Sequence, residues 1–265
     1  NVAEIPMTVT FKTSTRVMTL RVTKLETSHD WVSNVEFEAK NSASSTDIRS
    51  LIKFEQATKD YSVDFASGGA LNIYLTPVSE AVGSNVYYQF LLDGTVQTGD
   101  AYTPKKIESG ERLDVTSSAI LTQNIAWTEK TLTLLVGPLG DGEENLNAEK
   151  CNAYNFKIKK IPSFNSLEIK SEDGNESYEL NPAFHRQDSE YSVETTEDTI
   201  KIGIGLSGAT VTLPKGEANT GTKTKAWYVV KLSDYMTAGT NVAEIPMTVT
   251  FKTSTRVMTL RVTKL

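Results

Sequence analysis

The chain has very few residues suited to disulfide or metal chemistry: one cysteine, Cys151, and two histidines, His29 and His185, among 265 residues. A single cysteine excludes an intrachain disulfide, so packing and hydrogen bonds have to hold the fold together. Neither histidine has a serine, cysteine or second histidine at a motif spacing, which argues against a catalytic triad and a zinc site. We expect Cys151 to be a packed residue, His29 to lie in a linker and His185 to lie on a surface turn.

Long apolar runs and an excess of positive charge are also missing. No run approaches the ~20 residues that cross a bilayer, and the start of the sequence has no signal-peptide pattern. The 27 basic residues are outnumbered by 33 acidic ones, giving a net charge of -6, whereas a nucleic-acid-binding surface is basic. Because the sequence begins within a strand pattern and without Met, we expect it to be part of a longer chain.

Motifs for cofactors, metals and catalysis are weak. Residues 203–208 match the G-x-G-x-x-G dinucleotide pattern, but a strand-like run follows them where a phosphate-binding loop needs a helix. The acidic segments 140–145 and 171–176 lack the spacing of a calcium loop, so we predict turns there and leave calcium binding open. A Lys–Asn cross-link is likewise left open. No paired catalytic groups stand out, and we predict no enzyme activity, no cofactor and no metal.

Alternation of apolar and polar residues at a period of two dominates the sequence. Gly and Pro fall between short apolar runs, and Thr, Ser, Val and Tyr are abundant. This composition favours half-buried strands joined by turns. We therefore predict an all-β protein with few helices.

The first 25 residues recur without a change as residues 241–265, which sets a period of 240 residues (241 minus 1). Identity that includes surface-type Thr, Lys and Arg positions indicates recent duplication of a unit within a tandem array. An artificial duplication of the segment is the alternative. Alternation predicts a two-stranded hairpin in this segment, and an isolated hairpin is unstable unless another surface covers its apolar face.

A second, diverged repeat lies within the period. Phe54 precedes Tyr61 by seven residues, and alternating apolar residues follow. Phe184 precedes Tyr191 by the same seven residues, again with an alternating run after it. The last two strands of the two copies also correspond, in the pairs Tyr154–Met258, Phe156–Leu260, Ile158–Val262, Leu132–Met247, Leu134–Val249 and Val136–Phe251. Two copies of one β-sandwich domain are predicted.

These repeats define three segments. Domain A is expected at residues 26–161, with an insertion near 94–110, and domain B at residues 162–265. Residues 1–25 then correspond to the terminal strands of a preceding domain B. The connections at 161–163 and 26–30 are too short to be floppy tethers, so a chain of such domains is expected to be a semi-rigid rod.

Domain B resembles the bacterial cadherin-like repeat, an immunoglobulin-like β-sandwich that occurs in tandem on large secreted and surface proteins. The segments that carry the resemblance are LNPAF at 180–184, YSV at 191–193, GATVT at 208–212, GTN at 239–241 and MTLRV at 258–262. The resemblance covers nearly all of domain B, whereas domain A keeps only its Phe and Tyr anchors and its last strands. It implies a tandem surface scaffold and carries over no catalytic residues.

The aromatic pairs Tyr87–Tyr88 and Trp227–Tyr228 are the candidate contact surface, and we expect them at equivalent places in the two domains. One ring of each pair should point away from the core, where it can contact a neighbouring repeat or subunit. The predicted function is a structural repeat of an extracellular fibre, filament or stalk of a bacterial cell surface, assembling through strand and domain contacts. An adhesin or carbohydrate-binding module, with a glycan or protein partner, is the alternative.

Overall fold

The computed structural model of the chain describes residues 2–11, 14–23, 30–116, 127–206, 208–215, 217–222 and 224–265. It divides into two compact units, Asn1–Asp30 and Trp31–Leu265. The predicted linker residue His29 lies outside the described residues. No α-helix occurs in the described ranges; the helical turns there are the 3-10 segments η1 (Ser79–Ala81), η2 (Asp100–Tyr102), η3 (Ala148–Lys150) and η4 (Leu232–Asp234). The all-β prediction is confirmed.

The first unit is one antiparallel hairpin of β1 (Val2–Phe11) and β2 (Ser14–Thr23). Its register runs without interruption from the pair Val2↔Thr23 to the pair Phe11↔Ser14. The predicted hairpin is therefore present in this segment.

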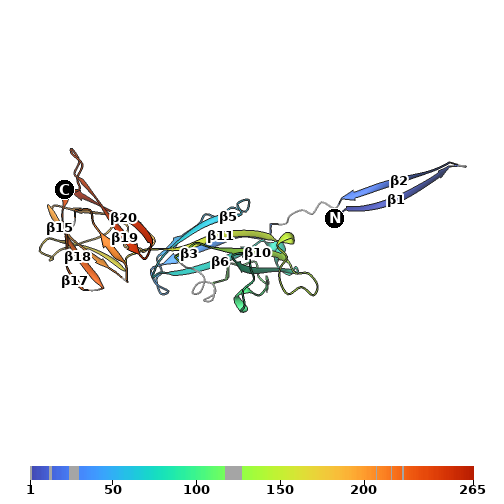
Figure 1. The fold of residues 1–265 in the computed structure, drawn as a ribbon, viewed down its shortest axis with the longest axis horizontal. Helices are drawn as coiled ribbons and strands as arrows, with labels where there is room; N and C mark the ends of the chain where they lie inside the picture. Colours follow the sequence, from blue (N-terminus) through green and yellow to red (C-terminus); the bar gives the residue numbers. More distant parts are fainter. Residues whose placement is uncertain are drawn as a thin grey trace. The chain divides into compact units, whose positions relative to one another are not determined.

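The second unit begins with sandwich A, which we define as residues 31–161 (Figure 1). Its first sheet has the order β4 (Ile48–Ser50), β3 (Val32–Lys40), β6 (Ala70–Pro77), β9 (Leu113–Asp114). Its second sheet has the order β5 (Asp60–Ala66), β11 (Asn152–Ile161), β10 (Lys130–Pro138), β7 (Val86–Leu92), β8 (Lys105–Lys106).

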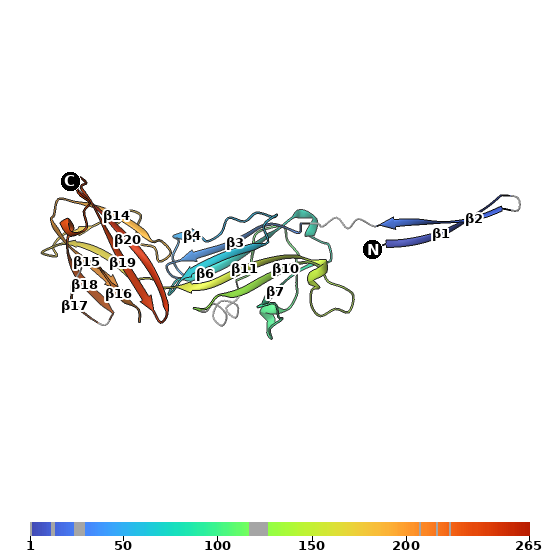
Figure 2. The same cartoon turned by 45° about the horizontal axis from the view of Figure 1, so that its top comes forward.

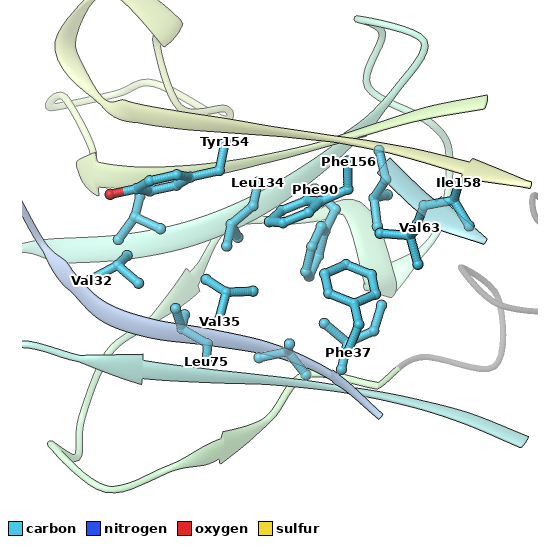
Figure 3. Packing of buried hydrophobic residues seen from close by; sticks show 14 of the residues in the cluster. Val32, Val35, Phe37, Val63, Leu75, Phe90, Leu134, Tyr154, Phe156 and Ile158 are labelled. Carbon is cyan, nitrogen blue, oxygen red and sulfur yellow. The ribbon is translucent and has the colours of Figure 1, made fainter. Parts of the chain in front are cut away.

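The core of sandwich A lies between these two sheets. Figure 3 shows Val35, Phe37 and Leu75 of the first sheet pointing toward Leu134 and Phe156 of the second. All five are almost completely buried. Alternation along each strand directs these side chains inward, so the period of two in the sequence corresponds to one buried face per sheet.

Sandwich B, residues 162–265, is built in the same way (Figure 2). One sheet has the order β13 (Ser177–Tyr178), β12 (Ser166–Ser171), β15 (Thr199–Gly205), β18 (Lys225–Lys231), β17 (Glu217–Thr222). The other has the order β14 (Glu190–Thr195), β20 (Ser254–Lys264), β19 (Val242–Phe251), β16 (Thr210–Thr212).

Apart from β8 in sandwich A and β17 in sandwich B, the two sandwiches share one strand order. In each, the first strand of the second sheet runs parallel to the last strand of the domain, β5 with β11 and β14 with β20. The other described pairings are antiparallel, and two such sheets packed face to face form an immunoglobulin-like β-sandwich. The tandem-sandwich prediction is confirmed by this arrangement.

The repeated Phe and Tyr anchors occupy the same place in both sandwiches. The rings of Phe54 and Tyr61 stack at 5.8 Å, and those of Phe184 and Tyr191 at 5.9 Å. The Tyr61 hydroxyl donates to the carbonyl of Glu55, and the Tyr191 hydroxyl donates to the carbonyl of His185. In both sandwiches the acceptor is the residue directly after the phenylalanine. Spacing in the sequence had predicted this correspondence.

One predicted correspondence has the wrong register. Leu132 pairs with Phe156, and the residue that pairs with Leu260 is Ile245. Leu132 therefore corresponds to Ile245 and not to Met247, a shift of two residues. A shift of two keeps every side chain on the same face, so alternation alone cannot detect it.

The insertion at 94–110 is an added part of sandwich A. Its strand β8 pairs with β7, and Tyr102 and Ile107 are 3% and 0% exposed. The buried side chain of Gln89 donates to the carbonyl of Tyr102 at 2.8 Å. The insertion thus extends one sheet and adds Tyr102 and Ile107 to the core of sandwich A.

Candidate functional site

The weak cofactor motif is confirmed as a strand feature. Gly203 and Gly205 lie within β15, and the strand β16 follows. An added Cβ at Gly203 would lie 2.6 Å from the Trp227 ring, and one at Gly205 would lie 2.4 Å from Ser166 Oγ. These glycines therefore allow close packing on the sheet.

The acidic segments form turns that close on themselves. The Asp173 carboxylate accepts hydrogen bonds from Ser171 Oγ and from the backbone and side-chain nitrogens of Asn175. These bonds, chiefly that from Ser171, lower the pKa of Asp173. Within the described ranges no three His, Cys, Asp or Glu side chains gather as a metal-binding group. In the same part of the chain, no helix has the length and hydropathy to cross a membrane.

A set of specific polar contacts joins sandwich A to sandwich B. It is centred on residues 184–188, which we call the junction loop, between the Phe184 and Tyr191 anchors. The Tyr191 hydroxyl donates to the carbonyl of His185 at 2.5 Å, and the Gln187 amide donates to His185 Nδ1 at 3.1 Å. The junction loop is thus held in shape from within sandwich B.

Arg186 and Asn41 form the centre of this junction. Asn41 follows the end of β3; its Nδ2 donates to the carbonyl of Phe184 at 2.9 Å, and its Oδ1 accepts from the Arg186 amide at 2.8 Å. The Arg186 guanidinium donates to the carbonyls of Asn41 at 3.2 Å and Phe164 at 2.9 Å, and to Asn165 Oδ1 at 2.6 Å. Burial lowers the pKa of Arg186.

Gln187 binds an end of sandwich A through its backbone. Its Nε2 donates to the carbonyl of Asp64 at 2.7 Å, and its Oε1 accepts from the amide of Ala66 at 3.0 Å. One side chain thereby pairs with a donor and an acceptor of β5. This two-point contact defines position and orientation more closely than a single bond would.

An ion pair lies beside these contacts. Arg49 of β4 donates from Nε and Nη2 to the carboxylate of Asp188 at 2.9, 3.1 and 2.9 Å. The Arg49 and Asp188 side chains are 29% and 19% exposed. The hydrogen bond with Asp188 raises the pKa of Arg49. Fork-shaped Arg–carboxylate pairs have a defined orientation, which suits a junction of fixed geometry.

The final hairpin of sandwich B supports the junction loop from behind. Arg256 of β20 donates to the carbonyl oxygens of Arg186 and Gln187. Burial is the main cause of a lowered pKa at Arg256. The β19–β20 hairpin is therefore part of the junction as well as of the core.

His185 lies inside the junction, so the prediction of a surface turn was wrong. The residue is 0% exposed. Burial, followed by the charge of Arg49, lowers the pKa of its imidazole. A polar residue between turn-forming neighbours reads as exposed in the sequence, whereas here the packing of one domain against another covers it.

The connection between the sandwiches leaves no free linker. Strand β11 ends at Ile161, and Phe164 is already 0% exposed in the core of sandwich B. Ser163 Oγ donates to the carbonyl of Arg186 at 2.9 Å. On another side of the junction the rings of Trp127 and Phe251 stack at 4.4 Å. The predicted stiffness of this connection agrees with these contacts.

The four candidate contact aromatics lie on non-equivalent strands, contrary to the prediction. Tyr87 and Tyr88 are on β7, whereas Trp227 and Tyr228 are on β18 in the other type of sheet. By its place in the sheet, the strand of sandwich B that corresponds to β7 is β16, not β18. The insertion in sandwich A changes the spacing along the chain, so counting residues matched strands of different sheets.

Their surroundings differ too. Tyr228 is 4% exposed and donates to the carbonyl of Val211, and Tyr88 packs against the core of sandwich A. Tyr87 and Trp227 are partly exposed. Trp227 packs on Gly203, with the ammonium groups of Lys170 and Lys225 at 5.5 and 4.8 Å from its ring centre.

Cys151 is partly buried beside Gly137, where an added Cβ would lie 2.6 Å from its sulfur. Burial, with a smaller contribution from Glu143, raises the pKa of the thiol to about 11. A reactive cysteine needs a lowered pKa. The expectation of a packed residue agrees with this environment.

No family model matches the sequence, and no curated protein sequence matches it. Among solved structures, the chain is similar to a titin I-band fragment at 10% identity and a TM-score of 0.22, covering 78% of this chain and 64% of that one. A chimeric titin Z1Z2 tandem matches at 9% identity and a TM-score of 0.24, over 78% and 95% of the two chains. An endo-fucoidan hydrolase of glycoside hydrolase family 107 matches at 11% and 0.22, over 100% of this chain and 38% of the hydrolase.

At TM-scores this low, none of these likenesses supports an argument. The immunoglobulin-like fold therefore depends on the strand order and register described above, and the cadherin-like resemblance stays a prediction.

The junction residues Asn41, Arg49, Arg186, Gln187 and Asp188 were missed in the sequence. Residues 185–188 lie within the seven-residue spacing of the Phe–Tyr anchors, but the corresponding stretch of sandwich A is polar and charged as well, so the sequence did not mark the junction loop.

Proposed function

We propose that the chain is a structural repeat unit of a long extracellular fibre, filament or stalk of a bacterial cell surface, and not an enzyme. The observation that supports this function most directly is the junction between sandwiches A and B. A chain that only tethers a binding head can use floppy linkers, whereas a load-bearing rod needs each domain held to the next.

The junction has the features expected of such a rod. Side chains of the junction loop bind backbone groups of β5 and the end of β3, and the connecting residues are packed into sandwich B. The exact recurrence of residues 1–25 as 241–265 adds a second argument, because it indicates that the whole A–B unit is iterated. The cadherin-like resemblance of domain B belongs to the same proposal.

Electron microscopy of the native, full-length surface material tests this function. We expect filaments with a regular axial repeat that corresponds to one A–B unit. Isolated globular particles, or beads on flexible strings without axial order, would contradict the structural role.

The carbohydrate-binding alternative depends on the partly exposed rings of Trp227 and Tyr87. Its test is a glycan array with the full chain and with the variants Trp227→Ala and Tyr87→Ala. If either substitution abolishes glycan binding, the function of an adhesin would replace that of a structural fibre. Because Trp227 packs on Gly203 beside two lysines, the ring already has partners within its own sheet.

A further inference from the structure

His185 is a buried titratable side chain at the contact between the two sandwiches. Its Nδ1 accepts a hydrogen bond from the Gln187 amide at 3.1 Å, so the proton of the neutral ring lies on Nε2. Nε2 is enclosed too, and it has no hydrogen-bond partner of normal geometry in the described part of the chain. The junction loop therefore suits the neutral imidazole, because only that form leaves Nδ1 free to accept.

The residue that bonds the His185 ring is also the one that binds β5 of sandwich A. Gln187 Nε2 donates to the carbonyl of Asp64 at 2.7 Å, and Oε1 accepts from the Ala66 amide at 3.0 Å. Between the two, the Arg186 amide donates to a side chain of sandwich A at 2.8 Å. A change at the imidazole therefore reaches these contacts through only two peptide units.

The charged groups of the junction give a protonated ring little support. Arg49 forms ion pairs with both aspartates that act on the imidazole, Asp47 and Asp188. The guanidinium groups of Arg186 and Arg256 lie in the same junction and bond backbone carbonyls. Three arginines against two aspartates make this site positive, and a protonated imidazole would add to that charge.

Two other elements bring titratable groups to the junction loop. Asp64 of β5 pairs with Lys159 at 3.6 Å, and Tyr191 of β14 donates its hydroxyl to the carbonyl of His185. Neither group changes the balance of charge, because the first is paired and the second is neutral below its raised pKa. Burial, followed by the charge of Arg49, lowers the pKa of the imidazole.

We propose that protonation of His185 weakens the junction, so that sandwich A is released from sandwich B more readily in mild acid than at neutral pH. The imidazolium has a proton on each nitrogen, so Nδ1 and the Gln187 amide become two donors that face each other. The loop moves to separate them and to bring the charge to water, and Gln187 loses its bonds with β5. Each sandwich stays folded, because its core lies between its own two sheets.

The sign of the pH effect depends on which form of the junction binds the proton first. In the open junction the imidazole of His185 reaches water, where its pKa is near the ordinary 6.5, whereas in the closed junction its pKa is lower. The neutral ring therefore supports the closed junction fully above about pH 6.5, and this support is lost as the pH falls. Each opening takes up at most one proton, so the opening constant rises by at most about tenfold per pH unit.

Amide hydrogen exchange of the full chain, measured residue by residue with NMR, tests the proposal. The amides of Ala66 and Arg186 report on the junction, because their acceptors lie across it. Those of Asn155 and Thr259 are the matched controls, since each bonds a carbonyl of its own sandwich. Between pH 7.5 and 5.5 we expect the protection factors of the junction amides to fall by about three- to tenfold, while those of the controls stay constant.

Two histidine variants separate this effect from the titration of other groups. His185→Gln retains an acceptor for the Gln187 amide but cannot be protonated, so the protection of the Ala66 amide should become the same at both pH values. His29→Gln removes the other histidine of the chain and should leave the fall in protection unchanged. In the unsubstituted chain, the midpoint of the fall should coincide with the titration of the His185 ring in the same NMR samples.

The proposal is wrong if the Ala66 and Arg186 amides are equally protected at both pH values in the unsubstituted chain. It is also wrong if the fall persists in His185→Gln, or if the control amides lose protection to the same extent, which would be unfolding of whole sandwiches. The inference rests on the junction that supports the proposed function, but its outcome is separate. Regular native filaments without the pH effect would retain the fibre and refute the switch, whereas the pH effect without filaments would do the reverse.

Discussion

Replacing Arg186 by alanine should loosen the junction between the two sandwiches. The substitution removes three guanidinium hydrogen bonds, to the carbonyls of Asn41 and Phe164 and to Asn165 Oδ1. Bonds to a charged donor contribute about 1.5–3 kcal/mol each, and part of this sum is offset because the partly buried guanidinium no longer has to be desolvated. We therefore expect a loss of about 2–4 kcal/mol in the free energy of unfolding of sandwich B.

Urea denaturation of the full chain in a Trp31→Phe, Trp127→Phe background, followed by tryptophan fluorescence, measures this loss, since Trp227 of sandwich B is then the one tryptophan of the chain. With a slope of about 2 kcal/mol per molar urea, the midpoint should fall by about 1–2 M. Arg261→Ala is the matched control, because that arginine makes two exposed ion pairs, which contribute little to stability, and its urea midpoint should stay close to that of the unsubstituted chain. Arg186→Lys should be intermediate, since one ammonium cannot reach all three acceptors. Equal midpoints for Arg186→Ala and Arg261→Ala would refute the role of Arg186.

Three further outcomes are expected. Gly203→Ala should destabilise sandwich B by about 1–3 kcal/mol, because its Cβ would lie 2.6 Å from the Trp227 ring; circular dichroism should show that adding Trp227→Ala recovers part of this loss, and purely additive effects would exclude the clash. His185 is neutral in the fold because its pKa is lowered, so the unfolded chain binds the extra proton and stability should fall as pH drops below about 6.5. The charged groups near the ring are Arg49, Asp47 and Asp188. The pH dependence of stability should shrink in His185→Gln, and an unchanged dependence would show that titratable groups other than His185 cause it. Cys151, with a pKa of about 11, should react with iodoacetamide at pH 8.5 roughly a hundredfold more slowly when folded than in urea, and equal rates would show that burial does not protect it.

Much of the fold follows from local patterns. Period-two alternation in the segment around Met258, Leu260 and Val262 requires a strand with one buried face, and the Phe–Tyr spacing of seven residues identifies the two copies because both anchors pack on each other. A turn residue such as Gly239, with φ of +83°, marks the start of the final hairpin. These features depend on residues that are close together in the chain, so the sequence alone is enough to predict them.

The junction depended on residues far apart in the chain. Nothing in the sequence places Asn41 beside Arg186, or Asp64 beside Gln187, because these contacts join residues more than a hundred positions apart. The same reason explains the errors at His185, whose burial comes from a neighbouring domain, and at Tyr87 and Trp227, whose sheets are assigned by strand pairing. Alternation determined which side of a strand is buried, and only the tertiary structure decided which strands pair and what lies across each face.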